Sequence, residues 1–229
     1  MLASKTALST RVAILRLVAR SFYAKARNDG RPFLVAHFIT NHCMCDCPSC
    51  LWKHNDWKDA PLAEIKQFYR AAKQQGFMAV AFTGGEPFLR KDIGEIVRFV
   101  KEDVGLNIAL FTTGWFLEKR MHEVLPYIDM LLVSFDSAKA ERHDEIRGKE
   151  GLFDRAVAGI RKARSFYPGL PIQINTCVQK GISEEVEDLI ALAQNLDVRI
   201  SFDVITEFRN GEEGSKFTET DTGLDAEEL

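Results

Sequence analysis

The sequence predicts an α/β protein that contains a parallel β-sheet. Six short runs of apolar residues alternate along the chain with five segments that have the spacing of amphipathic helices. The runs are apolar at successive positions, which is typical of strands covered on both faces. Polar residues follow several of the runs, at the end where a parallel sheet gathers its functional loops. These features fit either an open doubly wound sheet or a barrel.

The predicted elements are bounded by residues that start or stop secondary structure. Asp59 and Pro61 mark the start of the first helix, Gly76 follows its end, and Ser183 is expected to cap the last helix. Strand–helix units of this kind are joined by right-handed crossovers, which makes the strands parallel. The predicted strands are 33–40, 77–82, 107–111, 130–135, 171–178 and 198–205, and the predicted helices are 59–75, 91–104, 115–125, 152–167 and 183–196.

The composition is that of a globular protein without a membrane span. The 229 residues are 46% hydrophobic and 28% charged, with a net charge of −3, which argues against a disordered or fibrous chain and against a nucleic-acid-binding protein. No apolar run is long enough to span a bilayer. The stretch Val12–Ala19 is interrupted by Arg16 and lacks a signal-peptide cleavage site. We therefore expect a cytoplasmic protein.

The two ends of the chain carry opposite charge. Residues 1–31 contain seven Lys or Arg and one Asp, whereas residues 201–229 contain two Lys or Arg and nine Asp or Glu. Residues 8–27 have the pattern of a basic amphipathic helix, which would either pack over the bottom or edge of a barrel or lie on an anionic membrane surface. We expect a basic helical extension at 1–31, the α/β domain at 32–208, and an acidic tail or the start of a truncated helix at 209–229.

Four of the five cysteines lie within eight residues, directly after the first predicted strand. Cys43, Cys47 and Cys50 have the spacing C-x3-C-x2-C, and Cys45 is an additional thiol inside it. Thiolates are soft ligands that suit zinc and iron–sulfur clusters, and three protein ligands on a four-iron cluster leave one iron open. A zinc site completed by a nearby histidine and a redox-active dithiol are the alternatives. Cys177, in the fifth predicted strand, is expected to be a small buried apolar residue.

Polar and glycine residues at the other strand ends are candidates for ligand binding. Glycines allow the backbone to approach a ligand closely, a carboxylate can accept a hydrogen bond from an ammonium group, and hydroxyl groups suit a carboxylate or a ribose. Each residue has a structural alternative as a turn or cap. Arg147 could also bind a carboxylate of the ligand. It ranks below Ser134, because Arg147 could equally well form an ion pair on the protein surface. The candidates are Gly84, Gly85, Glu86, Thr113, Ser134, Asp136 and Asn175.

Taken together, the motifs resemble those of radical SAM enzymes. The cysteine motif after the first strand is followed by GGEP after the second, and TTG, SFDS with HDEIRG, and INTCV extend the similarity over about residues 33–205. The resemblance implies a partial (β/α)6 TIM-like barrel, here without its last helix. It also implies that Cys43, Cys47 and Cys50 hold a 4Fe-4S cluster and that the seven candidates above bind S-adenosylmethionine.

The resemblance further implies the activity and its partners. A one-electron donor such as flavodoxin or ferredoxin would drive reductive cleavage of S-adenosylmethionine to a 5′-deoxyadenosyl radical that attacks a substrate. Many members have an aromatic residue before the third cysteine, where this chain has Ser49, so Leu51 or Trp52 would cover the adenine instead. The segment KARNDGRPFLVAHF is similar to hopanoid-lipid-type members and suggests a lipid or isoprenoid substrate. A non-catalytic zinc-binding module and an inactive scaffold are the competing hypotheses.

Overall fold

The computed structural model describes residues 33–48, 50, 57–178 and 182–204, together with the isolated positions 15 and 19. The predicted basic helix at 8–27 (apart from positions 15 and 19), the acidic tail at 209–229, and the three positions Ser49, Leu51 and Trp52 lie outside the described residues. Within the described part, no helix has the length and apolar character needed to cross a membrane.

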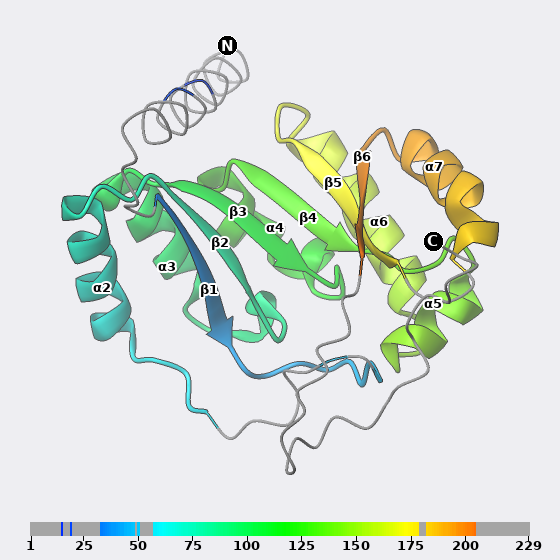
Figure 1. The fold of residues 1–229 in the computed structure, drawn as a ribbon, viewed down its shortest axis with the longest axis horizontal. Coiled ribbons are helices and arrows are strands. Elements are labelled where there is room, and N and C mark those ends of the chain that lie inside the picture. Colours follow the sequence, from blue (N-terminus) through cyan, green and yellow to red (C-terminus); the bar gives the residue numbers. More distant parts are fainter. Residues whose placement is uncertain are drawn as a thin grey trace.

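The strands form one parallel sheet in which they follow one another in chain order, from β1 to β6. A doubly wound sheet reverses its strand order at a switch point, so the sequential order selects the barrel from the two predicted architectures. The sheet is curved, and the described helices lie along its outer side (Figure 1). Strands β1 and β6 form the two edges of the sheet among the described residues, so the barrel is partial.

The observed elements match most of the predicted ones to within a few residues. The strands are β1 (Leu34–Thr40), β2 (Ala79–Gly84), β3 (Asn107–Thr112), β4 (Met130–Ser134), β5 (Ile172–Val178) and β6 (Arg199–Val204). The helices are α2 (Leu62–Gln74), α3 (Ile93–Arg98) with its π-helical continuation η2 (Phe99–Val104), α4 (Leu117–Val124), α5 (Ala140–Arg147), α6 (Leu152–Phe166) and α7 (Val186–Asn195). Three short 3-10 segments are η1 (Pro87–Leu89), η3 (Leu125–Tyr127) and η4 (Ser183–Glu185).

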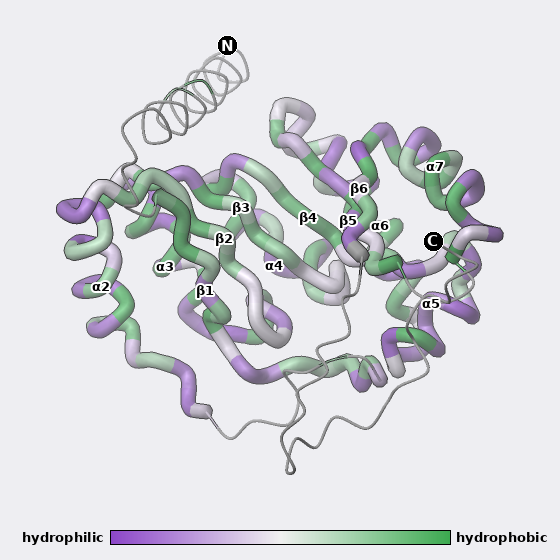
Figure 2. The backbone as a smooth tube through the Cα atoms, in the orientation of Figure 1, coloured by the Kyte–Doolittle hydropathy of each residue, from purple (hydrophilic) through white to green (hydrophobic). Residues whose placement is uncertain are grey.

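The two faces of the sheet differ in how they are covered. The face toward the helices is the main core, and the apolar character of its strands is visible in Figure 2. The other, concave face is more open in the described part of the chain: Leu34 is 50% exposed and Phe38 is 46% exposed. In the part of the chain that the structure describes, helices therefore cover the apolar runs on one side only. Fully buried residues on the helix side include Val80, Phe82, Leu110, Leu131, Val133 and Ile174.

Three sequence expectations about helices need correction. Helix α5 was not predicted, because its sequence AERHDEIR has no apolar stripe and His143 is its one buried residue. Asp59 does not cap α2; it accepts hydrogen bonds from Thr40 Oγ1 (2.8 Å) and the Asn41 amide (3.1 Å), at the end of β1. Ser183 makes no capping hydrogen bond to α7 and lies in η4 instead.

Candidate functional site

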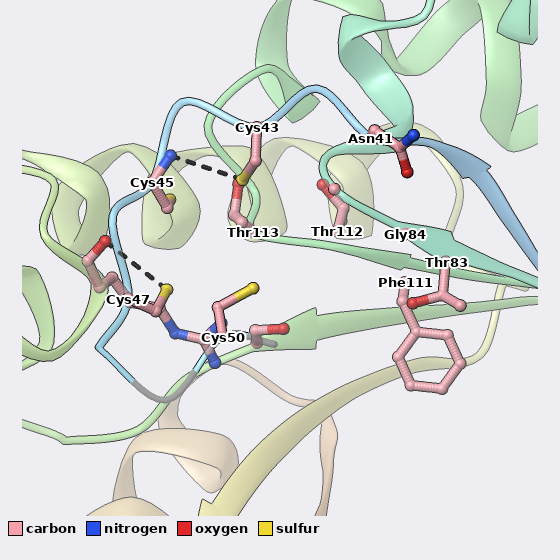
Figure 3. Close-up of a pocket in the computed structure, with 13 residues that line it drawn as sticks. Asn41, Cys43, Cys45, Cys47, Cys50, Thr83, Gly84, Phe111, Thr112 and Thr113 are labelled. Atoms are coloured by element: carbon pink, nitrogen blue, oxygen red, sulfur yellow. Dashed lines mark hydrogen bonds between the residues drawn. The ribbon is translucent and has the colours of Figure 1, made fainter. Parts of the chain in front are cut away.

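A pocket lies at the carboxyl ends of strands β1 to β4, where the parallel sheet brings its loops together (Figure 3). Seven of the ten predicted site residues line it, and Glu86, Asp136 and Asn175 lie outside its lining. The lining consists of Asn41, Cys43, Cys45, Cys47, Cys50, Thr83, Gly84, Gly85, Phe111, Thr112, Thr113, Ser134 and Arg147.

The four cysteines after β1 form a tight loop of free thiols at one side of the pocket (Figure 3). The Cys45 amide donates to Cys43 Sγ (3.4 Å), and the Cys50 amide donates to the Cys47 carbonyl (3.1 Å). Hydrogen bonding from the Cys45 thiol lowers the pKa of Cys43 and lowers that of Cys47 to about 6, although burial opposes both shifts. The same contacts raise the pKa of Cys45. The loop thus favours thiolates at Cys43 and Cys47, the form of cysteine that binds metals.

This donor set fits an iron–sulfur cluster. Thiolates are the ligands that such clusters use, and Cys43, Cys47 and Cys50 reach one pocket from a single loop. Among the residues that the structure describes, no three His, Cys, Asp or Glu side chains converge on the position of a single metal ion. A cubane cluster does not require such convergence, because each thiolate binds a different iron.

The end of helix α5 packs directly against the cysteine loop. The Arg147 carbonyl accepts hydrogen bonds from the Asp46 amide (2.9 Å) and the Cys47 thiol (3.7 Å). The last carbonyls of a helix have no partner within the helix, so this one is available to the loop. Gly148 follows with φ +58°, and a Cβ there would come within 2.7 Å of the Asp46 carbonyl oxygen. A helix missing from the sequence prediction therefore supports the predicted metal ligands.

The paired glycines after β2 pack against the backbone where the cysteine loop begins. Gly84 has φ +124°, and a Cβ there would lie 2.5 Å from the Thr40 carbonyl oxygen; at Gly85 it would lie 2.2 Å from that of His42. The Gly85 amide donates to the Thr40 carbonyl (2.8 Å), and the Glu86 amide donates to the His42 carbonyl (2.8 Å). The sequence predicted that a ligand would come close to the backbone at these glycines. In the structure the backbone of residues 40–42 comes close to it instead, although both glycines also line the pocket.

Glu86 points into the protein and not into the pocket. Its side chain is fully buried, and its four contacts come from Thr112 Oγ1 (2.8 Å), Phe88 N (3.0 Å), Thr113 N (2.7 Å) and Thr113 Oγ1 (2.6 Å). Burial raises the pKa of this carboxyl, and the hydrogen bonds from Thr113 counteract that rise. The direct contact with an ammonium group that the sequence suggested is thus replaced by contacts that position Thr112 and Thr113 in the pocket wall.

Asp136 lies behind the pocket and holds Arg147 in its wall. Asp136 Oδ2 is 2.6 Å from Arg147 Nε, and Asp136 Oδ1 accepts a hydrogen bond from the Cys177 amide (3.1 Å). Burial acts to lower the pKa of Arg147, but the negative charges of Asp136, Cys47 and Cys177 raise it above its ordinary value. The ion pair considered as the alternative role of Arg147 is therefore present, but it is largely buried and not on the surface, and Arg147 also lines the pocket.

The remaining predicted residues lie on the concave face of β4 and β5. Ser134 lines the pocket, and its hydroxyl makes no hydrogen bond to the described residues. Asn175 pairs with Ser134 in the sheet register, and its Oδ1 accepts a hydrogen bond from Ser201 Oγ (2.9 Å). Cys177 is partly exposed and not fully buried as predicted. Burial and the charge of Asp136 raise the pKa of its thiol to about 11.

Sequence reasoning left several pocket residues out of the site. Thr83 and Phe111 are followed in their strands by the motifs GGEP and TTG, and strand alternation places them on the concave face. Asn41 immediately follows β1, and Thr112 precedes the predicted Thr113. The alternation of the strands could have identified Thr83 and Phe111. No pattern in the sequence distinguishes Asn41 and Thr112 from their neighbours.

Comparison with known proteins assigns the family. The sequence profile of the radical SAM superfamily matches residues 38–193, and the chain belongs to that superfamily. It is 35% identical over 172 residues to the AdoMet-dependent heme synthase of Methanosarcina barkeri, covering 72% of this chain and 48% of that protein. It is 29% identical over 196 residues to the GTP 3′,8-cyclase of Nautilia profundicola, covering 82% of this chain and 60% of that protein.

Solved structures agree with this fold. The structure of Streptococcus suis SuiB bound to S-adenosylmethionine matches with a TM-score of 0.69 at 21% identity, over 85% of this chain and 46% of SuiB. The structure of anSMEcpe with bound AdoMet matches with a TM-score of 0.65 at 16% identity, over 80% and 53% of the two chains. The partial TIM-like barrel is thus confirmed, and the chain spans about half the length of the proteins that it matches.

Proposed function

We propose that this chain binds a 4Fe-4S cluster through Cys43, Cys47 and Cys50, together with S-adenosylmethionine in the adjoining pocket. Radical SAM enzymes use both groups, and when bound they supply a 5′-deoxyadenosyl radical that attacks the substrate. The observation that carries the proposal is the convergence of these three cysteines with the glycine pair, Thr113, Ser134 and Arg147 on one pocket.

The residues of the chain would divide the binding of S-adenosylmethionine among them. Arg147, fixed by Asp136, offers a guanidinium for the methionyl carboxylate, and the Ser134 hydroxyl offers a second donor. Gly84, Gly85 and Thr113 line the same space. Glu86 and Asp136 belong to this proposal as positioning residues behind the pocket, and Asn175 belongs to it as the neighbour of Ser134 on the concave face.

The test is anaerobic reconstitution with iron and sulfide, followed by electron paramagnetic resonance of the reduced protein with and without S-adenosylmethionine. A 4Fe-4S signal that changes on addition of S-adenosylmethionine is the expected result. Cys43→Ser, Cys47→Ser and Cys50→Ser should each lower bound iron and sulfide severalfold, whereas the matched control Cys45→Ser should retain them. Bound zinc without sulfide would overturn the proposal in favour of a zinc-binding module.

The source of the electron and the nature of the substrate are further parts of the proposal. A flavodoxin or ferredoxin would deliver the electron, and 5′-deoxyadenosine release with such a donor measures the cleavage. The lipid or isoprenoid substrate stays a prediction. The two relatives given above are named for heme and for GTP, and neither is named for a lipid. Co-sedimentation with anionic liposomes, compared between the full chain and a variant lacking residues 1–28, tests the membrane contact that the basic segment suggests; equal lack of binding contradicts it.

A further inference from the structure

The last residue of helix α5 brings a positive charge to one of the cluster ligands. Arg147 contacts Cys47 in two ways: its backbone carbonyl accepts a hydrogen bond from the Cys47 thiol (3.7 Å), and its guanidinium forms a hydrogen bond with the same side chain. Both residues line the pocket. A side chain of the pocket wall therefore also acts on a ligand of the cluster.

A buried ion pair fixes the position of this guanidinium. Arg147 Nε lies 2.6 Å from Asp136 Oδ2, and the two side chains are only 14% and 4% exposed. Asp136 is held in turn by the Cys177 amide, which donates to its Oδ1 (3.1 Å). Arginine is always charged in proteins, and water and salt screen a charge weakly where it is largely buried. The guanidinium is therefore a permanent positive charge beside Cys47.

The positive charge of the pair outweighs its negative charge at the Cys47 sulfur. Hydrogen bonding from the Cys45 thiol is the largest cause of the lowered pKa of Cys47, and burial opposes it. The charge of Arg147 then lowers this pKa by more than the charge of Asp136 raises it. This order agrees with the direct contact between Arg147 and Cys47. The pair therefore leaves a net positive field at this ligand.

We propose that Arg147 raises the reduction potential of the 4Fe-4S cluster through its contact with Cys47, and so favours the transfer of an electron to the cluster. This inference rests on the proposed function, because it requires the cluster to be bound by Cys47. Reduction adds one negative charge to the cluster, and a nearby positive charge or a hydrogen bond to a ligand sulfur stabilises the reduced form. The flavodoxin or ferredoxin donor loses the electron that the cluster gains, and no bond is made or broken. Arg147 is a positioning residue in this role, since it acts on the cluster through Cys47.

The test is a potentiometric titration of the reconstituted full-length protein without S-adenosylmethionine, followed by electron paramagnetic resonance. Arg147→Met removes the charge and keeps the backbone contact with Cys47. Its midpoint potential should fall, so that the ratio of reduced to oxidised cluster at a fixed potential drops by about threefold to tenfold, the range of a typical hydrogen bond. For a one-electron couple this corresponds to about 30–60 mV, at 59 mV per tenfold change.

Three further variants separate the effect of charge from an effect on structure. Arg147→Lys keeps a positive charge, and its potential should fall by less than that of Arg147→Met. The double variant Arg147→Met with Asp136→Asn leaves no unpaired buried charge, and its potential should also fall, which keeps the test decisive if Arg147→Met does not fold. Arg98→Met removes an exposed arginine at the end of α3 and should keep the wild-type potential.

A wild-type potential in the double variant, or an equal fall in Arg147→Met and Arg98→Met, would overturn the inference. So would a potential of Arg147→Lys as low as that of Arg147→Met. Failure of the proposed function is separate from these outcomes. It would appear as a resonance spectrum of the wild-type protein that S-adenosylmethionine leaves unchanged, whereas the potentials are measured without that molecule.

Discussion

Replacing Glu86 with glutamine should destabilise the protein, although the two side chains have nearly the same shape. Each carboxylate oxygen accepts one backbone N–H, from Phe88 on one side and from Thr113 on the other. Gln has a single acceptor oxygen, so its NH2 group must face one of these donors in either orientation. One buried backbone N–H then loses its partner, at a cost of about 1–3 kcal/mol.

Urea unfolding at neutral pH measures this cost. With a slope of about 2 kcal/mol per molar urea, the midpoint of Glu86→Gln should fall by about 0.5–1.5 M. The matched control is Glu95→Gln, because Glu95 is exposed and bonded to Lys66 on the surface; its stability should change by less than about 0.5 kcal/mol. Equal midpoints for Glu86→Gln and the wild-type protein would refute the assignment of Glu86 as a buried acceptor of four hydrogen bonds.

Three further predictions follow from other buried contacts. Asp136→Asn removes the negative charge that faces the buried Arg147 guanidinium, and the free energy of unfolding measured in urea should fall by about 3–5 kcal/mol; an unchanged midpoint contradicts this. Burial lowers the pKa of His143 to about 3 and that of His37 to about 4, so the unfolded chain binds the extra protons below about pH 6.5, and His143 alone should lower stability by about 2 kcal/mol between pH 7 and pH 5; His143→Phe should reduce the slope by that amount, and equal slopes would disprove it. Gly85→Ala should lower iron uptake on reconstitution, because its Cβ would lie 2.2 Å from the His42 carbonyl oxygen; wild-type iron content would exclude the clash.

Much of the fold could be predicted because its core follows simple periodicity. The strands and the longer helices have apolar residues where the helix-facing core needs them, and residues such as Phe82 and Leu110 are fully buried. The choice between barrel and doubly wound sheet depends on strand order, which local pattern does not encode. Which face of each strand packs against the helices is also not encoded locally, because it depends on the curvature of the whole sheet.

Seven of the ten predicted site residues line the pocket, whereas the carboxylates of Glu86 and Asp136 lie outside its lining. The cysteines and the glycine pair reach the pocket, as their motif spacing suggested. Glu86 and Asp136 were expected to contact a ligand, yet both carboxylates are turned inward, to Thr113 and Arg147. A sequence shows that a carboxylate lies at a strand end, but the partner that it binds there comes from a different loop.

Helix α5 shows why such partners escape sequence analysis. A helix of eight residues with six polar side chains is marginal on its own, and its stabilising contacts come from other parts of the chain. His143 stacks on Phe135 with ring centroids 5.0 Å apart, and Asp144 accepts the amide hydrogens of Gly151 and Phe153 at the start of α6. The helix then ends at Arg147, which holds both the cysteine loop and the pocket wall. Because the helix that supports the cysteine loop is itself held by these tertiary contacts, the geometry of the metal ligands depends on tertiary packing and not on their motif alone.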